Sequence, residues 1–144
     1  MELDLGQFGF SAAMALAAVG SGLGAGAAGM AAIGAWKKCF AQNRPAPFML
    51  LAFVGAPLTQ TIYGMILMDS LRTSATASSS KIFGIGIFGG LALGVSAWLQ
   101  GRAGAAASDA MGETGKGFGN FIIVLGLIET VAIFAMVFLL AELA

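Results

Sequence analysis

A single carboxylate, Glu129, interrupts an otherwise apolar stretch of the chain, GLIETVAIF (residues 126–134). An ionised side chain in the middle of a hydrocarbon layer costs about 2.5–3.5 kcal/mol on membrane-insertion scales, and such groups usually bind a cation or a proton. A purely structural Glu129 would stay protonated and donate a hydrogen bond between helices, yet a glutamine could do this without the charge. The residue types therefore favour ion or proton handling at this position.

Polar side chains in two other apolar stretches could meet Glu129. Counted from the ends that lie on the side of the first loop, Gln60, Gln100 and Glu129 lie about 13, 10 and 11 residues in, which at ~1.5 Å per helical residue places them within roughly 5 Å in depth. Thr59 adds a hydroxyl, and Tyr63 lies one turn from Gln60 on the same face. These oxygens form a nest that a small hard cation prefers, whereas a proton needs only the carboxylate and one acceptor.

Pro57 lies close to this polar set, inside the second apolar stretch. Its ring has no N–H for the carbonyl of Phe53 and disturbs the preceding helical turn. Backbone carbonyls near the polar residues are then free to turn toward a ligand, or the proline simply kinks the helix.

The elements that would position these residues are membrane-spanning helices. The chain has 144 residues, 58% hydrophobic and 10% charged, with a mean hydropathy of +0.91, far from the values of a soluble domain. Four apolar stretches each reach the ~20 residues that cross a ~30 Å hydrocarbon layer as a helix. They cover residues 8–36, 47–69, 81–110 and 118–143. We therefore predict an all-α membrane protein with four transmembrane helices.

The composition also excludes several kinds of site. The sequence has no histidine and one cysteine, Cys39, which excludes a Cys/His metal site and an intrachain disulfide. The formal net charge is zero, so nothing indicates nucleic-acid binding. The leader MELDLGQ is acidic, whereas a cleaved signal peptide begins with positive residues, so we expect the chain to start near Met1 and to keep its first apolar stretch.

The sequence contains an internal repeat, in which one predicted helical hairpin is followed by a second copy. Two pairs of segments show the repeat: LTQTI (58–62) over LIETV (127–131), and SGLGAGAAGMAA (21–32) over SAWLQGRAGAAA (96–107). The first alignment pairs Gln60 with Glu129. We predict a first hairpin over residues 1–75, in which Gln60 replaces the acid, and a second over residues 76–144, which carries Glu129. Each copy has two helices, so the copies share one orientation in the membrane, unlike inverted repeats.

Glycines crowd the first apolar stretch. Residues 24–29, GAGAAG, match G-x-G-x-x-G, but no predicted strand precedes them and no acid follows about 20 residues on, so we expect no dinucleotide site. The glycines of this stretch are Gly20, Gly22, Gly24, Gly26 and Gly29. Small residues let helix backbones approach closely in lipid, and their spread around the helix favours crowding on more than one side, as in a ring of helices.

Basic residues set the expected orientation. Five of them lie at or near the first and third loops: Lys37, Lys38, Arg44, Arg102 and Lys116. Only Arg72 and Lys81 lie near the second loop. By the positive-inside rule the first and third loops face the cytoplasm, and both termini lie on the outer side.

The duplicated hairpin and the motifs LIETVAIF, PLTQTIYG and SAWLQG resemble one protein family over essentially the whole chain. They are similar to the membrane proteolipid, often called the K or c subunit, that forms the rotor ring of V-type ATPases, in its bacterial form. The resemblance implies a homo-oligomeric ring in a bacterial cytoplasmic membrane. It also implies that the chain is no enzyme, because ATP hydrolysis takes place in other subunits.

The resemblance further implies an ion site centred on Glu129, as the ion-carrying carboxylate and the target of dicyclohexylcarbodiimide. In sodium-translocating members the positions that hold Na⁺ match Thr59, Gln60, Gln100, Glu129 and the backbone carbonyl of Ala56. The position of Tyr63 donates a hydrogen bond to the carboxylate. The same glutamines could instead tune a proton site, so H⁺ remains the alternative to Na⁺.

The implied partners follow from the cost of charge in lipid. An occupied Glu129 is neutral and can face lipid, whereas an empty one needs a cation or an aqueous path, which the family supplies as an arginine on a stator membrane subunit. Central-stalk subunits would dock on the cytoplasmic side, and the first loop, residues 36–47, is the candidate for this contact. Two other classes of membrane protein are alternatives to a rotor subunit: a small independent ion channel or transporter, and a purely structural membrane oligomer.

Overall fold

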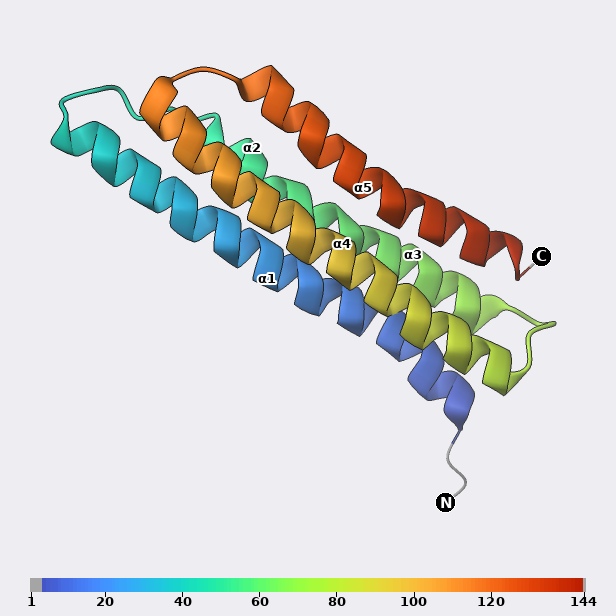
Figure 1. Ribbon diagram of the computed structural model, residues 1–144. Helices are drawn as coiled ribbons and strands as arrows, with labels where there is room; N and C mark the ends of the chain where they lie inside the picture. The colour runs from blue at the N-terminus through green and yellow to red at the C-terminus, as the bar shows by residue number, and fades with distance from the viewer. Residues whose placement is uncertain (1–3, 144) are drawn as a thin grey trace.

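The computed structural model describes residues 4–143, and within them every regular element is a helix. The elements are α1 (Leu5–Ala41), α2 (Leu50–Gly55), the 3₁₀ turn η1 (Ala56–Leu58), α3 (Thr59–Thr73), α4 (Ser79–Thr114) and α5 (Phe118–Ala141). Because α2, η1 and α3 follow one another along one axis, they form a single span (Figure 1). Four segments are thus long and apolar enough to cross a membrane, which confirms the predicted fold class.

The helices begin and end at capping residues that lie in the polar flanks of the apolar stretches. The Asp4 side chain accepts a hydrogen bond from the backbone N–H of Gly6 (2.9 Å) at the start of α1. Ser78 does the same for Lys81 (3.4 Å) at the start of α4, and Gly115, with φ of 67°, ends that helix in the left-handed conformation. The first and third helices therefore extend beyond their predicted limits at both ends.

Helix length sets how far each element reaches across a membrane. With 37 and 36 residues, α1 and α4 are each roughly 55 Å long at ~1.5 Å per residue, whereas the 24 residues of α5 span roughly 36 Å. A hydrocarbon layer is ~30 Å thick. The ends of α1 and α4 consequently project into the interface, where their charged residues can be solvated.

The helices form a bundle in which the loops alternate between the two ends (Figure 1). Residues 42–49 and 115–117 lie at one end, and residues 74–78 lie at the other end together with the start of α1 and the end of α5. α1 and α4 run parallel and make the most extensive contact, and α5 lies on the side of α4 away from α1. The predicted boundary between the hairpins, residue 75, falls in the loop between α3 and α4.

Glycine determines the contact between α1 and α4. A methyl group added at Gly20 would overlap the backbone of Gly94, and one added at Gly24 would overlap the backbone of Ala97. The prediction of close helix packing is confirmed for these two glycines. Gly22, Gly26 and Gly29 do not take part in such packing within the chain, and for them the prediction of crowding in a ring stays a prediction. The first two have no atom within 4 Å of an added Cβ, and the third only touches the Val54 side chain at 3.7 Å.

The second span departs most from its predicted limits. The sequence predicts a helix over residues 47–69, and the helix is observed over Leu50–Thr73. It begins later because Pro45 and Pro47 keep the preceding segment out of the helix. Pro57 is accommodated by the 3₁₀ turn η1.

This turn decides where the nearby backbone carbonyls point. The carbonyl of Phe53, which Pro57 deprives of its helical donor, faces Gly104 of α4, where an added Cβ would lie 2.9 Å from the oxygen. It is therefore the carbonyl of Ala56 that lies beside the polar residues, 3.0 Å from the hydroxyl of Thr59.

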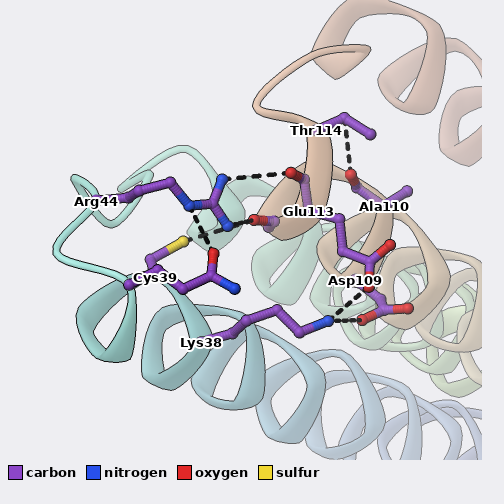
Figure 2. A network of polar contacts seen from close by, with 9 residues as sticks. Lys38, Cys39, Arg44, Asp109, Ala110, Glu113 and Thr114 are labelled. Atoms are coloured by element: carbon purple, nitrogen blue, oxygen red, sulfur yellow. Dashed lines mark hydrogen bonds and ion pairs between the residues drawn. The ribbon is translucent and has the colours of Figure 1, made fainter.

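A set of polar contacts joins the two hairpins at the end that holds the first and third loops (Figure 2). Lys38 donates to Glu113 (2.6 Å) and lies 3.9 Å from the Asp109 carboxylate. Arg44 donates to the carbonyl of Gly112 (3.0 Å), which belongs to the last turn of α4, where carbonyls lack a helical donor. The ion pairs are exposed and salt-sensitive. Lys38 thus joins the end of α1 to α4, and Arg44 joins the first loop to α4.

Candidate functional site

Glu129 lies on α5 and receives hydrogen bonds from two other helices. The hydroxyl of Tyr63, on α3, donates to Oε1 at 2.7 Å. Nε2 of Gln100, on α4, donates to Oε2 at 3.2 Å. Each carboxylate oxygen thus has one donor, and the two donors fix the direction of the carboxylate.

Gln100 and Gln60 continue this network across the bundle. Nε2 of Gln100 also donates to the carbonyl of Leu125 (3.0 Å), and its Oε1 accepts from Nε2 of Gln60 at 3.0 Å. The hydroxyl of Thr59 lies within hydrogen-bond distance of two further oxygens, Oε1 of Gln60 (3.2 Å) and the carbonyl of Ala56 (3.0 Å). The network therefore reaches from α5 through α4 to η1 and α3.

The acceptors on α5 determine the orientation of both amides. The side-chain nitrogen of Gln100 faces two acceptors, the carbonyl of Leu125 and the carboxylate of Glu129, so its oxygen must face Gln60. That oxygen requires a donor, so the nitrogen of Gln60 turns toward it, and the oxygen of Gln60 turns toward Thr59. A flip of either amide would bring like groups together.

Oxygens outnumber donor hydrogens at the Thr59 end of the network. Three oxygens meet there, from the Thr59 hydroxyl, the Gln60 amide and the Ala56 carbonyl. The Thr59 hydroxyl supplies one hydrogen, and the backbone N–H of Thr59 supplies a second, to the Ala56 carbonyl. Within residues 4–143 no group of three or more His, Cys, Asp or Glu side chains could hold a metal ion. A cation bound in this region would be held by one carboxylate together with amide, hydroxyl and carbonyl oxygens, the ligands of hard cations.

The site lies midway along the bundle between two apolar clusters. In α5, which spans Phe118–Ala141, Glu129 is near the centre. On the side of the first loop the cluster includes Phe53 and Leu125, and on the other side it includes Leu67. These clusters separate the polar network from both ends of the bundle. Apolar side chains therefore shield the site from water along the axis of the helices.

Burial differs within the network. The side chains of Gln60 and Gln100 are fully buried, with 0% exposure. Glu129, Tyr63 and Thr59 are half-buried, so the carboxylate lies at the lateral surface of the bundle. An ion can therefore reach Glu129 from the side of the molecule and not from within the helix core.

The structure brings together all six residues that the sequence analysis assigned to the site. Contacts of 3.2 Å or less join them in the order Ala56, Thr59, Gln60, Gln100, Glu129 and Tyr63. The carbonyl of Leu125 was not anticipated, because its role depends on how far the side chain of Gln100 reaches across to α5. Ser96, which donates to the carbonyl of Ile128 beside Glu129 (3.1 Å), was also missed. The only feature of the sequence that could have indicated Ser96 is its alignment with Ser21 in the internal repeat.

The fold and the site together define a class: a four-span membrane protein with one half-buried carboxylate held in an oxygen-rich network at mid-span. The family described as the C subunit of ATP synthase matches residues 83–141, which include Gln100 and Glu129. The chain is also 34% identical over 136 residues to the A-type ATP synthase subunit K of Methanocaldococcus jannaschii. Both comparisons thus find this chain similar to ATP synthase proteolipids.

These comparisons support the resemblance to the membrane proteolipid of rotary ATPases. The similarity to the archaeal protein extends over 93% of this chain. The chain spans 59% of the length of that relative.

Proposed function

We propose that this chain is the rotor-ring subunit of a V-type or A-type rotary ATPase and carries Na⁺ across the membrane on Glu129. One observation carries the choice of ion: apart from the backbone N–H of Thr59, which donates to the Ala56 carbonyl, the oxygens of Thr59, Gln60 and Ala56 share a single hydroxyl hydrogen. A bound cation satisfies these oxygens together with Oε1 of Gln100 and the carboxylate. Tyr63 then holds the carboxylate in place from outside the ligand set.

The lateral position of Glu129 suits a rotating carrier. With Na⁺ bound, the carboxylate is neutral and can pass along lipid, whereas the empty, ionised site must lie opposite a cation. In this proposal the cation is an arginine of a stator membrane subunit. Ion entry and exit by separate paths couples rotation of a homo-oligomeric ring to ATP hydrolysis or synthesis in other subunits, and this chain itself hydrolyses nothing.

The proposed sidedness follows the distribution of charge. The end of the bundle that holds residues 42–49 and 115–117 also holds Lys37, Arg44 and Lys116, and we place it in the cytoplasm of a bacterial cell. Central-stalk subunits would bind there.

Lys38 and Arg44 already contact α4, so they are poor sites for testing the stalk contact. Exposed Lys37 forms no ion pair within the described residues, and its charge can be reversed without breaking the contact to Glu113.

The ion is tested by the rate at which dicyclohexylcarbodiimide modifies the purified oligomer, measured across a Na⁺ titration at several fixed pH values. The reagent attacks the protonated acid, so a bound cation protects it. We expect one modified residue per chain, Glu129, and protection by Na⁺ that weakens as the pH is lowered, because protons compete. Glu129→Gln should abolish both labelling and ion transport and should leave the oligomer intact.

Other outcomes separate the alternatives. A labelling rate that follows pH alone would replace Na⁺ by H⁺ and make Gln60 and Gln100 tuning groups of a proton carrier. A Glu129→Gln variant that still transports ions would exclude the carrier role. A purely structural acid predicts unchanged transport, and an independent channel predicts transport without the partner subunits.

A further inference from the structure

Two serine hydroxyls are buried without any hydrogen-bond partner in the part of the chain that the structure describes. They belong to Ser21 on α1, which is 2% exposed, and Ser108 on α4, which is 0% exposed. A buried hydroxyl without a partner is costly, so its surroundings call for an explanation. The two serines differ in what lies opposite them.

The packing of α1 against the second span places Ser21 opposite Gln60. A Cβ added at Gly64 would lie 2.7 Å from Ala17, and one added at Gly24 would lie 3.0 Å from Pro57. These contacts show that α1 and the second span run antiparallel. Ser21 lies on the same face of α1 as Ala17 and Gly24, about one turn from each, and so is level with the position midway between Gly64 and Pro57.

The repeat gives an independent estimate of the same position. Ser21 aligns with Ser96, whose hydroxyl reaches the other helix of its own hairpin and donates to the carbonyl of Ile128. Ile128 aligns with Thr59 of the first hairpin. A serine at this place in the hairpin is therefore directed at the residues that carry the ion site.

Gln60 has a hydrogen to offer at this level. Its Nε2 carries two hydrogens, and one of them is donated to Gln100. The described residues provide no acceptor for the second, although the side chain is fully buried. Gln60 thus has a donor hydrogen without a partner at the level where α1 presents a hydroxyl without a partner, that of Ser21.

We propose that Ser21 is a positioning residue of the ion site. Its hydroxyl accepts the second N–H of the Gln60 amide, directly after rotation of the serine side chain or through one water molecule. This contact holds the amide oxygen of Gln60 toward Thr59 and the bound cation. This assignment rests on the proposed function, because Ser21 would act on ion binding through Gln60, a proposed ligand of that site.

The test compares Ser21→Ala with Ser108→Ala in the full oligomer, using modification of Glu129 by dicyclohexylcarbodiimide with Na⁺ as the protecting ion. Ser108 is the matched control because it is equally buried and equally without a partner. It lies eight residues after Gln100 on the same helix, roughly 12 Å along the axis at ~1.5 Å per residue. Oligomer mass and melting temperature are recorded for both variants.

We expect Ser21→Ala to raise the Na⁺ concentration for half-protection about fivefold, with Ser108→Ala unchanged, because loss of one hydrogen bond loosens one ligand. Ser21→Thr, which keeps the hydroxyl, should restore part of the loss if the oligomer forms. Equal protection of the Ser21→Ala variant and the unaltered protein would overturn the role of Ser21 alone. If the unaltered protein is modified but not protected by Na⁺, the proposed ion is wrong. The pH of half-maximal modification then becomes the readout for Ser21, and an unchanged value in Ser21→Ala overturns the proposal.

Discussion

At the scale of single residues, Gln100 links the carboxylate to the rest of the site. It contacts Glu129, Leu125 and Gln60 at once, and its own orientation follows from the two acceptors on α5. Thr59 lies at the far end of the network and does not contact the carboxylate directly in any of these hydrogen bonds. The two residues should therefore respond differently to substitution.

Thr59→Val tests whether the hydroxyl oxygen of Thr59 is a cation ligand. Valine has nearly the shape of threonine, so packing is kept and one oxygen is lost. We expect about tenfold weaker protection of Glu129 by Na⁺, equivalent to ~1.4 kcal/mol, with an unchanged pH dependence of labelling when Na⁺ is absent. A change in the pH dependence without any change in Na⁺ protection would contradict a ligand role and favour a proton site.

At the scale of helices, the depth of the site is set by the contact between α1 and α4. Gly94 on α4 meets the backbone of α1, and an added Cβ would lie 2.5 Å from the carbonyl oxygen of Leu16. Since Gln100 lies on the same helix, any shift of α4 along α1 moves Gln100 relative to Glu129. The glycines therefore serve the ion site as well as stability.

Gly94→Ala should force α1 and α4 apart. Overpacking costs about 1–3 kcal/mol, and here the obstacle is backbone, which cannot rotate away. We expect a lower melting temperature of the purified oligomer in detergent and weaker Na⁺ protection of Glu129. Gly84→Ala on the same helix is the control, because no atom lies within 4 Å of its added Cβ, and it should be neutral or slightly stabilising. Equal effects of the two substitutions would refute the role of the contact.

At the scale of the whole molecule, the two hairpins share one site. Gln60 aligns with Glu129 in the repeat, which suggests one potential carrier in each hairpin. In the folded chain both residues contact Gln100 and belong to a single hydrogen-bonded network. One chain of four helices thus offers one candidate ion site, built from both hairpins.

Gln60→Glu tests this sharing. In two independent hairpins the new acid would create a second carrier, and two residues per chain would react with dicyclohexylcarbodiimide. In the observed fold the new carboxyl lies in the same network as Glu129, where two like charges disfavour each other. We expect no more than one modification per chain, faster modification near neutral pH because one carboxyl holds a proton, and lost Na⁺ protection. Mass spectrometry of the labelled chain would count the adducts, and two adducts per chain would contradict a shared site.

The sequence by itself determined the spans and the polar side chains that meet at mid-span. Apolar length fixes a transmembrane helix because unpaired backbone groups are not tolerated in lipid. An acid among such residues is costly enough to indicate function, and helical rise places polar residues at one depth. These are local properties, and residues such as Glu129 and Gln60 could be identified from them.

Only the tertiary structure decided which groups face one another. The choice of the Ala56 carbonyl over that of Phe53 depends on a 3₁₀ turn and on Gly104 of the neighbouring helix. The division of the glycines into packed and open ones depends on which face of α1 meets α4. The position of Ser21 opposite Gln60 depends on the register of two helices. Such relations arise from contacts between distant segments, and periodicity within one segment carries no information about them.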